Sequence, residues 1–299
     1  MAKYVPDVMS RRWVIISTIR TSRPDVHNQT VKERSANVCP FCEGHEDMTP
    51  GEVFRIGEGK PDERGWKVRV FPNKFPITDF HEVIVHTPDE GRDLHQLSTE
   101  QIGLIFQAYR QRYNYYRDKG QVIIFCNRGE HAGASIKHPH SQLVVIPFQI
   151  NLDTLRKEPI NNLVEQNDFY NIYCPDFSQW PYEVWIAPKD ETSVFGDIKD
   201  NEIDDLAEIF QTIMKRLRQL HDIRSKTHED FSYNFYIHPK DNWYLRIIPR
   251  FIHRAGFELG TGLSVNITDP EDAAKELRSK NEEVSRIMKK LAELKKRKI

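Results

Sequence analysis

The sequence predicts an α+β fold made of two similar halves, with two antiparallel sheets and helices packed against them. A strand-like segment at 81–85 is matched by another at 182–186, an offset of about 101 residues, and each lies just before an X-Pro pair. In both halves a helical pattern and two further strand-like segments follow in the same order. The strands are joined by connections too short for parallel crossovers, except where the helix intervenes, so antiparallel pairing is expected.

Caps and apolar spacing predict one long helix in each half. Ser98 is placed to cap the first helix, and Gln101 to complete a capping box with it. Apolar side chains recur at helical spacing in the first half at Ile102, Ile105, Tyr109, Tyr113 and Tyr116. The same spacing occurs in the second half at Ile203, Leu206, Phe210, Ile213, Leu217 and Leu220. Both stripes are typical of helix surfaces that face a core.

The remaining strands and the join between the halves complete the predicted fold. The strands that follow the helices are predicted at 122–125, 143–147, 233–236 and 245–249. The polar segment 151–167 is typical of a linker, so the expected domains are residues 1–150 and 151–299. From Pro270 onward the spacing predicts a long amphipathic helix whose basic end is a solvated face.

The composition excludes several classes of protein. The chain has 299 residues, of which 38% are hydrophobic and 29% charged, as expected of a globular fold. Its formal net charge of -1 gives no basic coat for nucleic acid. No apolar stretch approaches the roughly 20 residues that span a bilayer. The first residues lack the apolar core of a signal peptide. We therefore expect no membrane contact and a cytoplasmic location.

The densest group of reactive side chains lies between two predicted strands, at 127–142. Two glycines and the small residues around them allow backbone N–H groups to approach an anion closely. His138 and His140 open the following strand, where side chains two positions apart point to the same face. Both imidazoles are therefore expected in one site, together with Gln142. A neutral imidazole can attack a phosphoryl group and hold it covalently, while a glutamine can donate to a phosphate oxygen.

A second chemical signal is the pair Cys39 and Cys42, whose two-residue gap is common in zinc sites. The chain has only four cysteines and no second pair of this kind, so other metal ligands have to come from a distance. His138 is the obvious one. Cys126 and Cys174 fall in predicted strands and are expected to be buried packing residues.

Together these motifs resemble the galactose-1-phosphate uridylyltransferase family, which belongs to the histidine-triad superfamily. The His-Pro-His-x-Gln run follows a loop with glycine and serine, and its glutamine replaces the last triad histidine, as in that family. The segments 11–16, 39–42 and 71–76 are similar to the family's N-terminal motif, zinc pair and nucleotide-contact segment. The resemblance extends from Arg11 to about Arg278 and implies a duplicated histidine-triad-like fold.

The resemblance also implies roles for individual residues. His140 would be the nucleophile, with Gln142 and Ser135 on the transferred phosphoryl group. The implied substrate contacts are Arg20, Arg23, Asn73, Asn127, Gly133, Phe257 and Gly260. The implied zinc ligands are Cys39, Cys42 and His138, with Glu90 standing where the family often has a further histidine. His95 or His86 are alternatives to Glu90, and a weak or empty metal site is another.

The implied reaction is a double displacement. A nucleoside-diphosphate sugar gives UMP, or another nucleotidyl group, to His140, and a hexose 1-phosphate takes it away. The segment 256–262 resembles the sugar-phosphate loop of the branch of ADP-sugar phosphorylases, in which inorganic phosphate is the acceptor.

A non-catalytic nucleotide-sugar-binding protein is a further alternative to the enzyme, and nucleic-acid binding by the basic tail is the weakest alternative. The second half lacks the additional His pair of the best-known members, so a second metal is not expected. The resemblance implies a homodimer.

Overall fold

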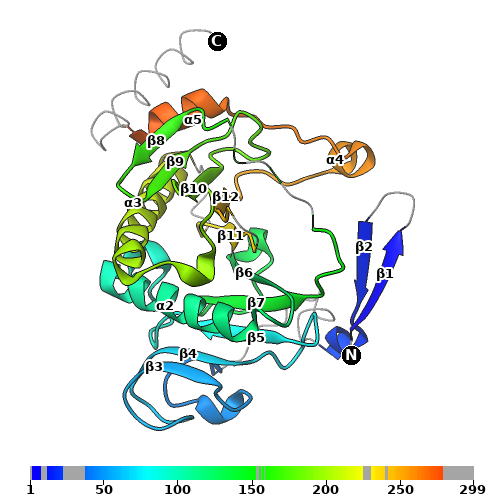
Figure 1. Ribbon diagram of the computed structural model, residues 1–299, viewed down its shortest axis with the longest axis vertical. Helices are drawn as coiled ribbons and strands as arrows, with labels where there is room; N and C mark the ends of the chain where they lie inside the picture. The colour runs from blue at the N-terminus through cyan, green and yellow to red at the C-terminus, as the bar shows by residue number, and fades with distance from the viewer. Residues whose placement is uncertain are drawn as a thin grey trace.

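The computed structural model describes residues 2–7, 12–22, 38–152, 155, 157, 159–224, 230–239 and 242–278 (Figure 1). Arg11, Arg23 and the part of the expected C-terminal helix beyond Arg278 lie outside these described residues.

A ten-stranded antiparallel sheet forms the centre of the described structure, in the order β3-β4-β5-β7-β6-β11-β12-β10-β9-β8 (Figure 1). The strands from the first half of the sequence are β3 (Phe54–Gly57), β4 (Trp66–Pro72), β5 (His81–Val85), β6 (Gln121–Arg128) and β7 (His140–Ile146). Those from the second half are β8 (Leu163–Gln166), β9 (Tyr170–Tyr173), β10 (Val184–Pro188), β11 (Tyr233–Ile237) and β12 (Leu245–Pro249). A separate hairpin consists of β1 (Lys3–Asp7) and β2 (Arg12–Ile16).

The α+β class and the antiparallel pairing are confirmed, but the two expected sheets are one continuous sheet. Strands β6 and β11 pair from Arg128 opposite Tyr233 to Ile124 opposite Ile237. An unpaired edge strand exposes a row of N–H and C=O groups, and joining the halves edge to edge removes two such edges. The order β5-β7-β6 recurs as β10-β12-β11, with a helix after the first strand of each set, as the repeat predicts.

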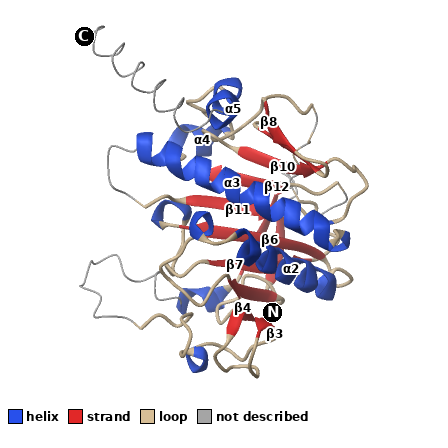
Figure 2. Ribbon diagram, turned by 90° about the vertical axis from the view of Figure 1, so that its left-hand side faces the viewer, coloured by secondary structure: helices blue, strands red, loops and turns tan. Residues whose placement is uncertain are grey.

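Two long helices cover one face of the sheet (Figure 2). They are α2 (Thr99–Tyr116) and α3 (Asp200–Arg224), and every residue of their predicted apolar stripes is buried. Side chains of β7 alternate between the two faces: Leu143 belongs to the main core under the helices, whereas Val144 packs on the other face against Tyr4 and Ile15. The remaining helical elements are α4 (Gly256–Thr261), α5 (Pro270–Arg278), η1 (Thr18–Ser22), η2 (Glu46–Met48), η3 (Leu94–Gln96), η4 (Glu130–Ala132) and η5 (Phe195–Asp197).

The structure differs from the sequence-based expectation in three local features. The Oγ of Ser98 accepts from the Gln101 N–H at 3.1 Å, but the Gln101 side chain donates to the carbonyls of Lys67 and His86 instead of closing a capping box. Residues 163–166 of the expected linker form strand β8, because β9 offers their backbone a partner. The segment 256–262, expected as a loop, consists largely of helix α4.

Two further observations concern the cysteines and the membrane. Cys126 and Cys174 are both buried, as expected, although Cys174 lies one residue beyond β9 rather than within a strand. Among the described residues, no helix combines the length and the apolar character needed to cross a bilayer.

Candidate active site and metal centre

His140 is the first residue of β7 and lies with Gln142 on the sheet face opposite the helices, as their spacing predicts. Only 8% of its surface is exposed, and the Phe41 ring packs against it with ring centroids 5.2 Å apart. Its Nδ1 lies 2.7 Å from the carbonyl oxygen of His138 and donates to it. The proton is therefore on Nδ1, and the lone pair that a nucleophilic imidazole uses is on Nε2.

The side-chain amide of Gln142 is oriented by two neighbours. The backbone N–H of Ile77 donates to Nδ1 of His81 at 2.9 Å, so Nε2 of His81 carries the proton. That Nε2 lies 2.9 Å from Oε1 of Gln142, and the amide nitrogen of Asn73 lies 3.4 Å from the same oxygen. Because both donors use Oε1, the NH2 group of Gln142 is the end that can donate to a ligand.

The loop between β6 and β7 is shaped by two glycines in left-handed backbone, Gly129 with φ of 83° and Gly133 with φ of 76°. At Gly129 an added Cβ would clash with the side chain and the backbone of Ser232, so only glycine fits. Asn234 of β11 donates to the side-chain oxygen of Asn127 at 2.8 Å and to the carbonyl of Ala132 at 3.0 Å. The second half of the sheet therefore holds the loop of the first half.

The loop amides are used differently from the expectation. The N–H of Gly133 donates to the carbonyl of Glu130 at 2.9 Å, and the N–H of Ala134 donates to the carbonyl of Gly129 at 3.1 Å. These two amides, expected to meet an anion, are instead committed to closing the turn. Ser135 follows them and is exposed.

Three groups that can hold a metal ion meet beside this loop. The Sγ atoms of Cys39 and Cys42 lie 3.4 Å and 3.5 Å from Nδ1 of His138. The Nε2 of His138 lies 2.7 Å from the carbonyl of Thr87 and donates to it, so the lone pair is on Nδ1, which faces both thiols. A tetrahedral zinc ion with ordinary Zn–S and Zn–N bonds places sulfur and nitrogen about 3.6 Å apart. The residues present therefore fit zinc. The imidazole of His138 belongs to this cluster. It is not aligned with the side chains of His140 and Gln142 on the face of β7.

Of the three candidates for a further ligand, only Glu90 lies at the cluster. Its Oε2 is 3.6 Å from Sγ of Cys42. His86 lies in the core, where its Nε2 is 3.0 Å from the hydroxyl of Tyr109. His95 lies beside Asp93. The two histidine alternatives are therefore excluded by their positions.

The surroundings affect the ring and the thiol of the cluster in opposite ways. Burial lowers the pKa of His138, which favours the neutral imidazole that a metal requires. Burial also raises the pKa of Cys42 to about 12, and Cys39 and Glu90 add to this effect. A bound cation favours the thiolate, so metal binding and thiol ionisation are coupled.

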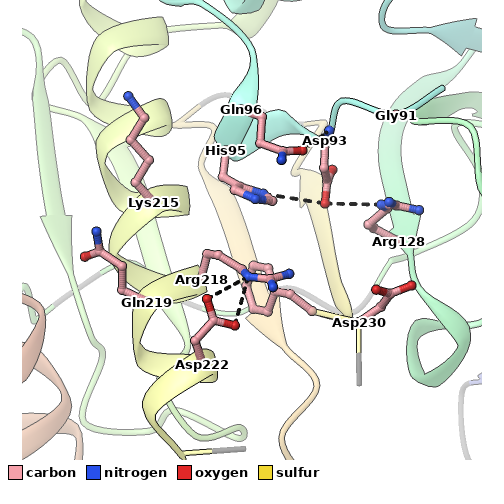
Figure 3. A pocket seen from close by; sticks show the side chains of 11 residues that line it. Gly91, Asp93, His95, Gln96, Arg128, Lys215, Arg218, Gln219, Asp222 and Asp230 are labelled. Atoms are coloured by element: carbon pink, nitrogen blue, oxygen red, sulfur yellow. Dashed lines mark hydrogen bonds and ion pairs between the residues drawn. The ribbon is translucent and has the colours of Figure 1, made fainter. Parts of the chain in front are cut away.

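On the helix-covered side of the sheet, Arg128 connects the loop to a pocket of about 550 Å³ (Figure 3). Its Nη1 donates to the carbonyl of Lys137 at 2.7 Å, and its Nε lies 3.2 Å from a carboxylate oxygen of Asp93. Asp93 also accepts from the hydroxyl of Tyr233 at 2.7 Å. Figure 3 shows the Asp93 carboxylate between Arg128 and His95. Lys137, which precedes His138, is thus held by the guanidinium of Arg128. The ion pair of that guanidinium with Asp93 lies on the helix-covered side of the sheet.

Arg20 and Asn73 are connected through one short segment of chain. The guanidinium of Arg20 donates to the carbonyl of Phe75 at 2.9 Å, which docks η1 on the segment that carries Asn73. Arg23, the other expected arginine, lies outside the described residues.

Phe257 and Gly260 are not brought to His140 within one chain. Both lie on α4, which Figures 1 and 2 place apart from β7. Phe257 is 55% exposed, and Leu259 beside it is 78% exposed. This helix projects from the sheet instead of folding back over it, so its apolar side chains face outward.

Sequence reasoning missed several residues that shape the site. His81 was predicted only as part of a strand, although its position at the start of the strand that precedes Thr-Pro was a usable signal. Asn234 is opposite Asn127 in the β6–β11 ladder, a pairing that joins the two halves and that no local pattern indicates. Arg128 lies at the end of β6 and pairs with Asp93, a residue far away in the sequence, so no local pattern indicates this contact.

Comparison with known proteins agrees with these motifs. The family model described as "Galactose-1-phosphate uridyl transferase, N-terminal domain" matches residues 80–148, which contain the His-Pro-His-x-Gln run. An ADP-glucose phosphorylase of Arabidopsis thaliana is 27% identical over 329 residues, covering 91% of this chain and 91% of the relative. A galactose-1-phosphate uridylyltransferase of Thermotoga maritima is 25% identical over 320 residues, covering 92% of this chain and 98% of the relative.

Solved structures of similar proteins share the fold of this chain. The crystal structure of the ADP-glucose phosphorylase from Arabidopsis thaliana with bound ADP-glucose superposes with a TM-score of 0.71 at 25% identity, covering 94% of this chain and 100% of that one. A uridylyltransferase structure, at 23% identity and a TM-score of 0.70, shares the fold over 93% of this chain and 98% of that one. The resemblance to the galactose-1-phosphate uridylyltransferase family is confirmed, and the named relatives are enzymes.

Proposed function

We propose that this chain is a nucleotidyltransferase of the galactose-1-phosphate uridylyltransferase type. In this proposal it moves UMP, or another nucleotidyl group, between a nucleoside-diphosphate sugar and a hexose 1-phosphate through a covalent intermediate on His140. The observation that carries the proposal is the hydrogen bond from Nδ1 of His140 to the carbonyl of His138, because it leaves the nucleophilic lone pair on Nε2. The oriented amide of Gln142 on the same face supplies a donor for the phosphoryl group.

The two steps of the proposed reaction balance without a further reactant. Nε2 of His140 attacks the α-phosphorus of the nucleotide sugar, and the bond from that phosphorus to the bridging oxygen breaks. The hexose 1-phosphate leaves with the electron pair, while the carbonyl of His138 stabilises the cationic ring through Nδ1–H. In the second step an oxygen of the incoming phosphate attacks the same phosphorus, and the P–N bond breaks, which returns the electron pair to Nε2.

A second candidate function is phosphorolysis of an ADP-sugar, in which inorganic phosphate takes the nucleotidyl group from His140. The similarity to an ADP-glucose phosphorylase along nearly the whole chain favours this candidate. Both candidates use the same first step, so they differ only in the base that is bound and in the acceptor of the second step.

The proposed metal site holds zinc on Cys39, Cys42 and His138, with Glu90 beside them. The sulfur-to-nitrogen distances and the hydrogen bond from His138 to Thr87 support this ligand set. Zinc would supply a structural cross-link between the cysteine turn and the loop that ends at His140. In this proposal substrate binding and the covalent intermediate are assigned to side chains of the chain and not to the metal.

We also propose a homodimer and a division into domains at residues 1–150 and 151–299. Exposed apolar side chains on β2 and η1 (Val14 55%, Ile19 52%) and on α4 (Phe257 55%, Leu259 78%) support an interface with a second copy. In such a dimer α4 of one protomer would be free to reach the other protomer's site.

The repeated strand–helix–strand–strand order supports the proposed division into domains at residues 1–150 and 151–299. A cytoplasmic location stays a prediction from the sequence.

Intact-protein mass spectrometry tests the proposed function directly. After brief exposure to UDP-glucose, or separately to ADP-glucose, without an acceptor, we expect a mass gain of one nucleotide monophosphate. His140→Asn should show no gain, whereas His221→Asn, on the helix-covered side, should label like the parent. Discharge of the adduct by galactose 1-phosphate or by inorganic phosphate then separates the two candidates. Tight nucleotide binding without any adduct would contradict the proposal and support a binding protein.

A further inference from the structure

His86 is a fully buried polar residue that has no part in the proposed reaction. It directly follows β5 and lies on the helix-covered side, behind the strand that begins at His140. The Nδ1 of its ring has no hydrogen-bond partner among the described residues, so the ring's polar contacts are made through Nε2. Buried polar groups are normally satisfied, and a histidine held by one nitrogen in the core calls for a physical reason.

The contacts of His86 fall on both sides of the proposed nucleophile. Its backbone N–H donates to the carbonyl of Pro139 at 3.0 Å. Its Nε2 lies 2.7 Å from the hydroxyl of Ser141. One residue therefore fixes the position that precedes His140 and the position that follows it.

This support matters because the regular strand pairing ends at this point. His140 is opposite Val85 in the ladder with β5, but the ladder with β6 stops one residue later, at Ser141 opposite Cys126. On that side the thiol of Cys126 lies 3.3 Å from the carbonyl of His140 and takes the place of a backbone partner. The end of the strand is consequently held by side chains instead of by a second ladder.

Helix α2 in turn holds His86. The side-chain nitrogen of Gln101 donates to the carbonyl of His86 at 2.7 Å. The hydroxyl of Tyr109, also on α2, lies 3.0 Å from Nε2 of His86 and 2.5 Å from the hydroxyl of Ser141. The three side chains of His86, Tyr109 and Ser141 form a closed triangle of hydrogen bonds that is buried in the core.

We propose that His86 is a positioning residue for His140, which connects α2 to Pro139 and Ser141 and so fixes the direction of the His140 imidazole. The expected effect on the rate of adduct formation rests on the proposed function. The expected effect on the orientation and tautomer of the His140 ring does not. In-line attack on a phosphorus requires a reacting atom placed within about 0.5 Å, and a displacement of about 1 Å costs roughly 100-fold in rate.

The decisive variants are His86→Phe, which keeps an aromatic ring but removes Nε2, and His86→Gln, whose side-chain amide can reach the place of Nε2. A matched control is Val122→Ala, which opens a cavity in the same core on β6 without contacting 139–141. Two readouts apply to each purified full-length variant. One is the single-turnover rate of nucleotide adduct formation, together with the affinity for UMP and AMP. The other is the tautomer of His140 in nucleotide-free protein, observed by nitrogen-15 NMR of the histidine rings.

We expect His86→Phe to slow adduct formation by about 10- to 100-fold while nucleotide affinity changes less than about threefold. The same variant should convert the single Nδ1–H tautomer of His140 into a mixture. His86→Gln should restore most of the rate, and Val122→Ala should lower the thermal stability without altering either readout. A parental rate and an unchanged tautomer in His86→Phe would overturn the inference. If the parent protein forms no adduct, the proposed function fails, and the NMR comparison still decides the positioning role.

Discussion

The carbonyl oxygen of His138 lies 2.7 Å from Nδ1 of His140, while Nδ1 of the same His138 faces the thiols of Cys39 and Cys42. The backbone of the residue in the metal cluster thus sets the tautomer of the proposed nucleophile. The proposed metal site and the proposed nucleophile therefore depend on one short segment, residues 138–140.

Loss of the metal cluster should loosen this segment. We expect His138→Ala to lose bound zinc and to unfold at a lower temperature, because two thiols without the imidazole no longer form a closed site. Metal content by mass spectrometry and thermal unfolding measure the two effects. Cys174→Ser, which alters a buried thiol away from the cluster, serves as the control and should keep its zinc. Equal zinc content in parent and His138→Ala would exclude this ligand set.

The orientation of the Gln142 amide depends on His81. In His81→Phe the nearer of the two donors to Oε1 is lost and only the longer contact from Asn73 is left, so the amide can turn its oxygen toward the phosphoryl group. We expect kcat to fall by about 10-fold with little change in KM, since the interaction develops in the transition state. Gln142→Ala should lower kcat by about 100-fold. The hypothesis is wrong if His81→Phe changes KM alone.

The ion pair between Arg128 and Asp93 should contribute to the stability of the fold. Arg128→Met removes the donor to the Lys137 carbonyl and the partner of Asp93, and we expect a loss of about 2 kcal/mol in the free energy of unfolding. Denaturant unfolding measures this loss. The matched variant is Arg218→Met, in the same pocket, whose partner Asp222 lies on the same exposed helix face. It should cost less than about 0.5 kcal/mol, and similar costs for both variants would contradict the assignment.

A second buried ion pair should affect stability alone. The carboxylate of Glu82 binds the guanidinium of Arg112 and accepts from the hydroxyl of Tyr116 at 2.8 Å, all within the core. Glu82→Gln leaves the guanidinium buried without a counter-charge, which should cost about 3 kcal/mol. Asp197→Asn, which breaks the exposed pair with Arg117, should cost less than about 1 kcal/mol. Adduct formation should be unchanged in both, and a slower rate in Glu82→Gln would show that the pair also supports the site.

The acid limit of stability should depend on His86. Burial, followed by the nearby charges of His140, His138 and Arg128, holds the pKa of His86 well below its usual value of about 6.5. The unfolded chain therefore takes up the proton first as the pH falls. The contribution of the neutral ring to stability is complete above pH 6.5 and is lost progressively below it. Unfolding free energies measured between about pH 7 and pH 5 should fall less steeply in His86→Phe than in the parent. Parallel curves would contradict this prediction.

Local patterns predicted those elements whose signals lie within one stretch of sequence. The apolar stripes of α2 and α3 identified their buried faces, and the two-residue spacing of His140 and Gln142 identified a shared strand face. The expected capping box failed for a tertiary reason, because the Gln101 side chain binds the carbonyls of Lys67 and His86. His86 and His95, the histidine alternatives for the further metal ligand, do not lie at the cluster. The spacing of residues does not tell in which direction the chain turns after β5.

The sequence by itself determined the repeated strand–helix–strand–strand order, the cysteine pair and the reactive histidine motif, because side-chain periodicity and residue chemistry are local properties. The tertiary structure decided that the two halves share one sheet, through the pairing of β6 with β11. It also decided which nitrogen of His140 keeps its proton and which end of the Gln142 amide is occupied by donors from the chain itself. These features depend on hydrogen bonds between groups far apart along the chain, and no pattern within a single segment records which partners folding will bring together.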